Sequence, residues 1–272
     1  SIINGHSNVG KTTMVLYLMV NAAIRHGWKW VVYSSENRTA ALKKTLIQFA
    51  MNKNVTSMNH MERKRAYEWV GKHFTVISNK QVYSYGDIIV FLEKILRQQE
   101  VDAVFVDPYN SLKLDMGTTN KSSHEYHYEA ASEFLTFSTA NNVAVWLNMH
   151  AFSEAQRRKG EDGLPTAPYA EDTEGGGKFV NRADCFITIH RKVQHPDHSQ
   201  RRITEFHVRK VRDVETGGQP TGLDDPVRLE MNTSRTGFRV WPKQNLLFDA
   251  VELQSGEQDV INFPINTSFL QQ

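Results

Sequence analysis

A glycine-rich loop near the start of the chain restricts the possible folds more than any other feature of the sequence. Residues 5–12 read GHSNVGKT, in which two glycines separated by four residues are followed by Lys11 and Thr12. Such a loop wraps around an anion only when a strand leads into it and a helix leads out, because its backbone N–H groups must converge at the start of that helix. The apolar residues before the loop and at 14–23 meet this requirement. We therefore expect an α/β fold that binds a polyphosphate.

The side chains of the loop indicate ATP with magnesium as the ligand. Lys11 supplies a positive charge at the β- and γ-phosphates, and the Thr12 hydroxyl is an oxygen ligand for Mg²⁺. The glycines let the backbone approach the phosphates closely. The residues expected to contact the nucleotide in this segment are Gly5, Ser7, Asn8, Val9, Gly10, Lys11, Thr12 and Thr13.

Segments of strand length and helix length alternate along the chain. This order predicts a mainly parallel twisted sheet with helices on both faces. After a glycine turn at 217–218, two further strands are expected to form an antiparallel C-terminal hairpin. The expected strands are residues 28–35, 74–78, 103–106, 143–149, 185–190, 203–211, 227–231 and 237–241, and the expected helices are residues 14–23, 40–51, 61–73, 88–98 and 122–141.

The sequence divides into one large domain and a short tail. We expect residues 1–241 to form the domain and residues 242–272, which have no strong hydrophobic period, to form an arm. Residues 151–177 are polar and glycine-rich, and a loop of this length inside a compact domain is usually functional. The chain begins within a predicted strand and without a methionine, so we interpret it as a fragment of a longer protein.

Composition restricts the compartment and the partners. The formal net charge is +2, from 32 basic and 30 acidic residues, so any binding of nucleic acid must come from a local group of cations. A single cysteine, Cys185, excludes an intrachain disulfide and fits a reducing compartment. No apolar run reaches the roughly 20 residues of a membrane span, so no membrane is expected. We expect a protein of the cytoplasm, in a bacterial or phage-infected cell, or of an organellar matrix.

Two carboxylates that follow predicted strands are candidates for the metal site and for the chemistry. Asp107 follows the apolar run 103–106, and the carboxyl ends of strands face the ligand in such sheets. We expect Asp107 to hold Mg²⁺ with Thr12, whereas the alternative is that it only begins the turn at Pro108. Glu36 ends the strand 28–35 and could polarise a water molecule for attack on the γ-phosphate, or it could be a solvated charge.

The order of these motifs resembles the motor domain of the DnaB-type replicative helicases of superfamily 4. The phosphate loop, Ser-x-Glu at 34–36, the strand before Asp107 and a strand followed by His150 occur in the family's order. GGGKFVNRAD at 175–184 resembles the segment that leads from the family's DNA-facing loop into a strand, and Lys-Val-Arg at 210–212 resembles its Lys-x-Arg element. The resemblance covers the whole domain and implies a RecA-like P-loop NTPase core.

Two departures from the DnaB pattern indicate a branch of this family. The sequence Asp-Pro-Tyr at 107–109 replaces a more polar turn, and the loop after His150 lacks the Asn-Arg pair that DnaB places beside its sensor. Both features are similar to the phage helicase–primase and to mitochondrial Twinkle.

The resemblance implies roles for residues around the nucleotide. Glu36 would be the general base, His150 the sensor of the γ-phosphate, and Arg191 the arginine that packs against the nucleotide base. The sites would lie between subunits of a hexameric ring, with Lys210 and Arg212 contributed by the next subunit. The strand 203–211 alternates its side chains between two faces, so we expect these two cations to point the same way. The alternative is an exposed pair of cations at a strand edge.

The resemblance also implies single-stranded DNA in the central channel of the ring, contacted by residues 115–123 and 153–178. In the second segment Arg157, Arg158, Lys159 and Lys178 suit phosphate groups, although a solvated charge run is the alternative. No aromatic residues are interleaved with these cations, so we expect no base stacking. A primase or a loading protein is a further partner that the resemblance suggests.

Two other functions are compatible with the same motifs. One is a RecA/RadA-like or KaiC-like oligomeric ATPase without unwinding activity. The other is a binding module that ATP gates without being hydrolysed.

Overall fold

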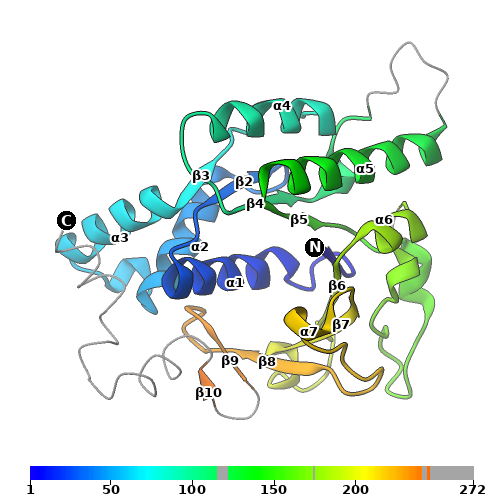
Figure 1. Ribbon diagram of the computed structural model, residues 1–272. Coiled ribbons are helices and arrows are strands. Elements are labelled where there is room, and N and C mark those ends of the chain that lie inside the picture. The colour runs from blue at the N-terminus through cyan, green and yellow to red at the C-terminus, as the bar shows by residue number, and fades with distance from the viewer. Residues whose placement is uncertain (115–121, 174, 241–243, 246–272) are drawn as a thin grey trace.

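The computed structural model describes residues 1–114, 122–173, 175–240 and 244–245. Within these residues a single sheet of ten strands runs through the molecule, in the order β10-β9-β8-β7-β6-β1-β5-β4-β2-β3 (Figure 1). The strands are β1 (Ile2–Asn4), β2 (Trp30–Ser34), β3 (Phe74–Val76), β4 (Ala103–Asp107), β5 (Ala144–Asn148), β6 (Cys185–His190), β7 (Ile203–Val211), β8 (Val227–Met231), β9 (Phe238–Val240) and β10 (Gln244–Asn245).

The sheet changes from parallel to antiparallel at β7. Strands β1 to β6 run parallel to one another, whereas β7, β8, β9 and β10 each pair antiparallel with the strand before them. The expected mainly parallel sheet with an antiparallel C-terminal hairpin is therefore confirmed, and the antiparallel part extends beyond the hairpin of β8 and β9. Because β7 runs back along β6, Val211 at its end lies opposite Cys185 at the start of β6.

Helices cover both faces of the sheet, as expected (Figure 1). Helices α1, α2 and α3 pack into one hydrophobic core, and α4, α5 and α6 contribute to a second core across the sheet. The helices are α1 (Lys11–His26), α2 (Thr39–Met51), α3 (His60–His73), α4 (Tyr85–Leu96), α5 (Ser123–Asn141), α6 (Gly177–Arg182) and α7 (Val214–Gly217). Short 3₁₀ turns occur at Val55–Ser57, Tyr109–Ser111, Ser153–Arg157, Ala170–Asp172 and Gln200–Arg202.

The two cores explain why the central strands β2 and β4 are apolar at every position before their last residue. In β2, Trp30 and Val32 enter one core, whereas Val31 and Tyr33 enter the other. Successive side chains of a strand point to opposite faces, and here both faces are covered by helices. The same alternation divides β4, so the continuous apolar run of the sequence is the signature of a strand buried on both sides.

Capping residues set helix bounds that the hydrophobic pattern alone did not give. Helix α4 begins at Tyr85 and not at the expected residue 88, because Ser84 and Asp87 form a capping box there. Helix α1 begins at Lys11, directly after Gly10, which has a left-handed φ of 93°. The helix ends just before Gly27, whose φ of 72° is typical of a glycine that stops a helix, so α1 is longer at both ends than the expected residues 14–23.

The long polar segment from residue 151 to residue 173 folds over the edge of the sheet as a compact loop. Two isolated bridges, Ala151 to Thr173 and Lys159 to Pro165, hold it in shape. Of the expected arm at 242–272, only β10 lies within the described residues, and of the expected DNA loop at 115–123, residues 115–121 lie outside them. In the part of the chain that the structure describes, no helix has the length and apolar character needed to cross a membrane.

Candidate functional site

The candidate residues gather at one edge of the sheet because the parallel strands all end there. The phosphate loop follows β1, Glu36 follows β2, Asp107 ends β4, His150 follows β5, and Arg191 follows β6. The carboxyl edge of an open parallel sheet is the usual place for a ligand. The structure thus brings together residues that are far apart in the sequence.

The glycines of the phosphate loop are required by close backbone packing. A Cβ at Gly5 would lie 2.4 Å from the carbonyl oxygen of Ile189, and this backbone atom has little freedom to move away. Gly10 has a φ of 93°, a conformation that other residues rarely adopt. The loop therefore folds against β6 in a shape that only glycine allows at these two positions.

Lys11 is buried and is held by groups of its own chain. Its Nζ donates to the carbonyl oxygens of Gly5 and His6, at 3.0 and 2.9 Å, and lies 3.2 Å from Nδ1 of His150. Burial lowers the pKa of Lys11 to about 8, although Asp107 and Glu36 oppose the shift. A phosphate close to this ammonium group would raise the pKa again, because a nearby anion favours the charged form of lysine.

Asp107 is the most heavily hydrogen-bonded group of the site. Thr12 Oγ1 lies 2.9 and 3.1 Å from its two oxygens, and Oδ2 also accepts from Ser34 at 2.9 Å and from Asn37 at 3.0 Å. The side-chain amide of Asn148 donates to Oδ1. The carboxyl is 1% exposed, and this burial raises its pKa against the effect of these donors. A hydroxyl and a carboxylate in contact are the hard oxygen ligands that Mg²⁺ prefers, so Thr12 and Asp107 fit this ion.

Contacts of Asp107 with Ser34, Asn37 and Asn148 were not predicted, and Ser34 was noted only as part of the Ser-x-Glu motif. Ser34 and Asn148 are the last residues of β2 and β5, where a polar residue ends an otherwise apolar strand. A polar residue at the end of an apolar strand is the signal that could have indicated Ser34 and Asn148, because the ends of parallel strands meet at one edge.

Glu36 and His150 form the opening of the site. The His150 ring connects Lys11 to Glu36, because its Nε2 lies 3.4 Å from Oε1 of Glu36. A lysine ammonium only donates, so Nδ1 of His150 accepts and Nε2 carries the proton toward Glu36. Burial lowers the pKa of His150, and the Lys11 charge lowers it further, so the ring is neutral near pH 7. Ser111 Oγ also donates to Glu36 Oε1, at 3.2 Å.

One detail of the expectation for Glu36 was wrong. Strand β2 ends at Ser34, and Glu36 lies two residues beyond it in a turn. The turn forms because Ser34 Oγ accepts from the backbone N–H of Asn37 at 3.2 Å. The turn leaves the Glu36 side chain 51% exposed, within reach of a water molecule.

Beside the phosphate loop lies a hollow that is large enough for the rest of a nucleotide. Its volume is about 930 Å³, and its lining includes Gly10, Thr13, Arg191 and Arg235. Among the described residues, its lining contains no acidic side chain. Arg191 donates to the carbonyl of Asn8 at 3.2 Å, and both burial and the neighbouring charge of Arg235 lower its pKa. The hollow therefore suits an anionic or aromatic ligand, and Arg235 is a candidate that the sequence analysis missed.

The cations of the long loop differ from one another in environment. Arg157 and Lys159 are exposed. Arg158, in contrast, forms a two-point ion pair with Asp172, in which Nη1 lies 3.0 Å from Oδ1, and it packs 4.9 Å above the ring of Tyr169. Two of the three consecutive cations therefore remain available to a phosphate chain, and the third holds the loop together.

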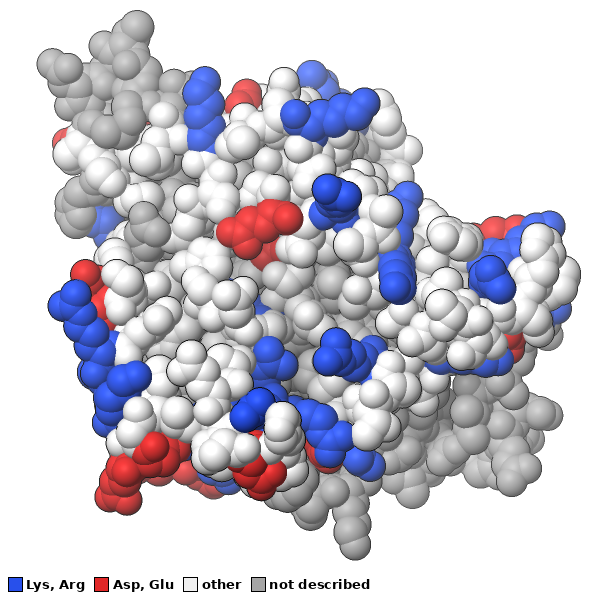
Figure 2. Space-filling model, turned by 180° about the vertical axis from the view of Figure 1, so that it is seen from behind, with Lys and Arg blue, Asp and Glu red and all other residues white. Residues whose placement is uncertain are grey.

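No aromatic residues are interleaved with the three consecutive cations in the sequence, but the fold places an aromatic ring beside two cations of α6. Lys178 and Arg182 lie 5.1 and 4.4 Å from the ring centre of Tyr128, which is 50% exposed. These residues are separated by about 50 positions in the sequence and meet only when α5 and α6 pack together, so a linear pattern could not show them. On the face shown in Figure 2, lysines and arginines lie in separate groups with acidic side chains between them, in keeping with a nearly neutral chain.

Lys210 and Arg212 lie at the opposite edge of the sheet from the phosphate loop. Both bind the C-terminal carbonyls of α6: Lys210 Nζ donates to Val180 at 2.7 Å and Arg212 Nη2 to Arg182 at 3.0 Å. Arg212 also forms an ion pair with Asp184 at 2.7 Å. The two side chains point the same way, as expected, and cations are favourable at the end of a helix. Within one chain these groups are far from the nucleotide edge because β7 runs antiparallel to β6.

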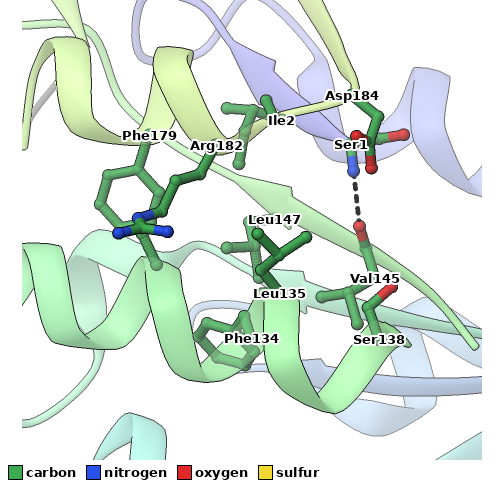
Figure 3. Close-up of a pocket in the computed structure, with 12 residues that line it drawn as sticks. Ser1, Ile2, Phe134, Leu135, Ser138, Val145, Leu147, Phe179, Arg182 and Asp184 are labelled. Carbon is green, nitrogen blue, oxygen red and sulfur yellow. Dashed lines mark hydrogen bonds between the residues drawn. The ribbon is translucent and has the colours of Figure 1, made fainter. Parts of the chain in front are cut away.

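A small cavity lies at this same edge. Its volume is about 50 Å³, and Figure 3 shows it between α5, α6 and the beginnings of β1 and β5. The amino group of Ser1 donates to the carbonyl of Val145 at 2.7 Å beside it, and Asp184 forms part of its wall. The cavity is far too small for a nucleotide, so the larger hollow at the phosphate loop is the candidate site.

Three histidines are buried behind the phosphate loop. His6, His190 and His207 are 3%, 2% and 4% exposed, and the rings of His6 and His190 are 6.0 Å apart. His190 lies opposite Glu205 on β7, and His207 lies 3.4 Å from the same carboxylate. Burial lowers the pKa of His190 to about 4. The sequence analysis did not identify this cluster, because its members come from three separate strands or loops.

Comparisons with known proteins agree with this geometry. The family model described as the DnaB-like helicase C-terminal domain matches residues 1–225. A chloroplastic and mitochondrial Twinkle homologue of Arabidopsis thaliana is 24% identical over 230 residues, which are 80% of this chain and 31% of that protein. The chain thus spans less than a third of that relative's length.

Solved structures share the fold at low sequence identity. A DnaB-like replicative helicase, solved in a study of its interactions with primase, superposes with a TM-score of 0.68 at 16% identity, over 87% of this chain and 56% of that one. A solved ATPase domain gives 0.67 at 17% identity, over 87% and 82% of the two chains. A KaiC-like protein of Pyrococcus horikoshii gives 0.56 at 13% identity, over 89% and 88%. The expected RecA-like P-loop fold is thereby confirmed.

The low pKa of His190 predicts that the fold is less stable in acid. The unfolded chain binds a proton on this histidine near its ordinary pKa of 6.5, whereas the folded chain does so only near 4, so stability is lost as the pH falls between these values. At pH 5 the loss from this group is about 2 kcal/mol relative to pH 7. Urea unfolding of the wild type and of His190→Gln at both pH values measures it, and His190→Gln should show a smaller change. His60→Gln, at an exposed position, is the control, and equal changes in all three proteins would contradict the prediction.

Proposed function

Because the chain belongs to the family of DnaB-like helicase C-terminal domains, we propose that it is the motor domain of an ATP-driven replicative DNA helicase. In this function it binds ATP with Mg²⁺, hydrolyses it at the interfaces of a hexameric ring, and moves along single-stranded DNA. The observation that carries the proposal is the convergence of Lys11, Thr12, Asp107, Glu36 and His150 at one edge of the sheet. A primase or a loading protein is a proposed partner of the whole assembly.

Each group at this edge has a place in the hydrolysis of ATP. Lys11 exchanges the carbonyls of Gly5 and His6 for the β- and γ-phosphates, which offer it full negative charge. Thr12 and Asp107 would hold Mg²⁺, which would supply positive charge beside the phosphates. Asp107 is held in place for this role by donors from β2 and β5.

Glu36 acts as the general base in this proposal. It accepts a proton from a water molecule while the water oxygen bonds to the γ-phosphorus and the bond to ADP breaks. His150 touches both Lys11 and Glu36, so the arrival or departure of the γ-phosphate at Lys11 changes the hydrogen bonding of the base. This contact supports the role of His150 as the γ-phosphate sensor.

The hollow beside the loop would hold the base and the sugar. Arg191 and Arg235 face it together, and a guanidinium group packs well against an aromatic ring. The phosphate loop residues Ser7, Asn8, Val9 and Thr13 complete the contacts proposed for the nucleotide.

The position of Lys210 and Arg212 supports a site shared between subunits. Both lie at the edge opposite the phosphate loop of their own chain, so a contact with phosphate requires a second chain. In this proposal Arg212 leaves Asp184 when a neighbouring γ-phosphate arrives, and it stabilises the charge of the transition state.

Single-stranded DNA would meet the long loop and the start of α6. Arg157 and Lys159 supply exposed charge, and Lys178 with Tyr128 supplies a cation beside an exposed ring. A hollow of about 710 Å³ near these residues is lined by Phe152, Lys178 and residues 175–177, which are all glycine. Exposed aromatic rings let bases stack without regard to sequence, so the affinity should depend little on base sequence.

The first prediction tests hydrolysis. Lys11→Ala should lose both nucleotide binding and turnover, because it removes the charge that meets the phosphates. Glu36→Gln should keep nucleotide binding and lose turnover by roughly 10²- to 10⁴-fold, because only the base is removed. Phosphate release and binding of a fluorescent ATP analogue measure the two properties. Glu68→Gln, an exposed acid on α3, is the control, and full turnover by Glu36→Gln would remove Glu36 from the mechanism.

The second prediction tests the DNA contact. The double variant Arg157→Ala with Lys159→Ala should bind oligo(dT) more weakly, with a log–log salt slope lower by about 0.7 for each lost phosphate contact. Including Arg158→Ala should add a loss of thermal stability, because that side chain pairs with Asp172. The matched control is Lys43→Ala with Lys44→Ala, two adjacent exposed lysines of α2. An unchanged slope in the first variant would show that the exposed cations only solvate the loop.

The third prediction tests the shared site. Arg212→Ala alone and Lys11→Ala alone should each be inactive in an assembled ring, by about 10³-fold or more for the arginine. Mixed rings of the two should recover some hydrolysis, at interfaces where an intact loop meets an intact arginine. Asp184→Ala is the control, because it removes the partner within the chain but keeps Arg212. Normal hydrolysis by Arg212→Ala would show that this residue only caps α6.

A further inference from the structure

Two side chains fasten the long loop to the phosphate loop. Asn4, which is fully buried, donates from Nδ2 to the carbonyl of Tyr169 at 3.0 Å. His6 lies 3.0 Å, through Nε2, from the carbonyl of Thr166. A carbonyl only accepts, so Nε2 of His6 carries the proton and donates it. We name these two hydrogen bonds the latch.

His6 connects the latch to the catalytic lysine. Its side chain bonds the long loop, while its own carbonyl oxygen accepts from Lys11 Nζ at 2.9 Å. Asn4 Oδ1 accepts from the N–H of Gly5 at 2.6 Å, and the carbonyl oxygen of Gly5 is the other backbone acceptor of Lys11 Nζ. Both carbonyls that hold Lys11 therefore belong to residues that the latch positions.

On the other side, the latch reaches the cationic part of the loop. The N–H of Thr166 donates to the carbonyl of Arg158 at 3.1 Å, and the N–H of Tyr169 donates to Asp172 at 2.6 Å. Asp172 in turn pairs with Arg158, whose guanidinium lies over the Tyr169 ring. Residues 158–172 thus form one small hydrogen-bonded unit. The exposed Lys159 lies in its bridge to Pro165, and the exposed Arg157 directly precedes the unit.

The surface beneath this unit is polar, and its other contacts with the unit are also polar: Arg209 donates to the carbonyl of Pro168 at 3.4 Å, and Lys192 pairs with Asp162. The hydroxyls of Thr173 and Thr188 and both ring nitrogens of His190 are buried there without a hydrogen-bond partner among the described residues. Few residues of the unit are buried, Pro168 and Ala170 among them. A segment with few buried apolar contacts moves at low cost, so its position depends on its polar contacts, and among those of the described residues only the latch reaches the phosphate loop.

We propose that His6, supported by Asn4, is a positioning residue that couples the long loop to the phosphate loop. When a polynucleotide draws Arg157 and Lys159 toward its phosphates, the unit shifts, Thr166 moves with it, and His6 moves the carbonyl on which Lys11 rests. Lys11 then turns more readily to the γ-phosphate. This inference rests on the proposed function, in which the long loop meets single-stranded DNA and Lys11 meets ATP.

The test compares phosphate release with and without oligo(dT). His6→Leu removes the donor to Thr166, whereas His6→Gln keeps a side-chain N–H that can reach the same carbonyl. The stimulation factor, the ratio of the two rates, should fall by roughly two- to tenfold in His6→Leu, the usual effect of one hydrogen bond, and should be largely retained in His6→Gln. The affinity for oligo(dT) should stay that of the wild type in both.

Two further variants separate coupling from folding. His207→Leu makes the same change at a buried histidine with no hydrogen bond to the long loop among those seen in the structure, and it should keep the wild-type stimulation. His6→Asn, which is polar but too short to reach Thr166, should behave as His6→Leu even if the leucine variant unfolds. Thermal unfolding of each variant identifies any loss of fold.

Each outcome decides the matter. Wild-type stimulation in His6→Leu or His6→Asn, or an equal loss in His6→Gln, would overturn the coupling and leave the proposed function intact. A wild-type protein that hydrolyses ATP but neither binds oligo(dT) nor responds to it would overturn the DNA part of the proposed function, and the coupling with it. The wild-type control therefore distinguishes the two failures.

Discussion

The buried carboxylate of Asp107 is the contact on which the candidate site depends. It accepts hydrogen bonds from β2, from the turn after β2, from the start of α1 and from the end of β5. A buried carboxylate is costly unless such donors surround it, so the ends of these elements are held around one point. The phosphate loop and the turn that carries the proposed base Glu36 are anchored by the same set of contacts.

The cations of the site are satisfied by their own chain before any ligand arrives. Lys11 rests on two carbonyls and a histidine, Arg158 on an aspartate and a tyrosine, and Arg212 on a helix end and an aspartate. A phosphate that binds one of these cations must therefore displace a partner that the chain already provides. The net free energy gained in each exchange is modest, which would suit the proposed motor, because it must release its ligands in every cycle.

The sequence predicted most of the fold because its signals are local. A glycine loop, buried apolar strands and helix stops lie within a few residues of one another, and β6, β7 and β8 were found with their observed bounds. Asp107 was predicted from the end of its apolar strand and His150 from the resemblance, and both lie at the same edge of the sheet as the phosphate loop. The features that could not be predicted are contacts between residues that are distant in the sequence.

Three contacts that were not predicted show how such pairs depend on the fold. Arg235 faces Arg191 across 44 positions only because the hairpin of β8 and β9 bends toward the phosphate loop. The contact of Tyr128 with Lys178 needs the packing of α5 on α6, and the fixing of Arg158 by Asp172 needs the fold of the long loop. A run of three cations looks uniform in sequence, and only their surroundings distinguish a structural arginine from two exposed charges.

The reversal of the chain at β7 gives the molecule a front and a back. Its phosphate loop lies at one edge of the sheet, and its Lys210 and Arg212 lie at the other. If those cations complete a neighbour's site, each such contact joins the back of one subunit to the front of another. Whether a head-to-tail assembly closes into a ring or continues as a helix is then set by the rotation between neighbours, a property of the interface and not of the site chemistry.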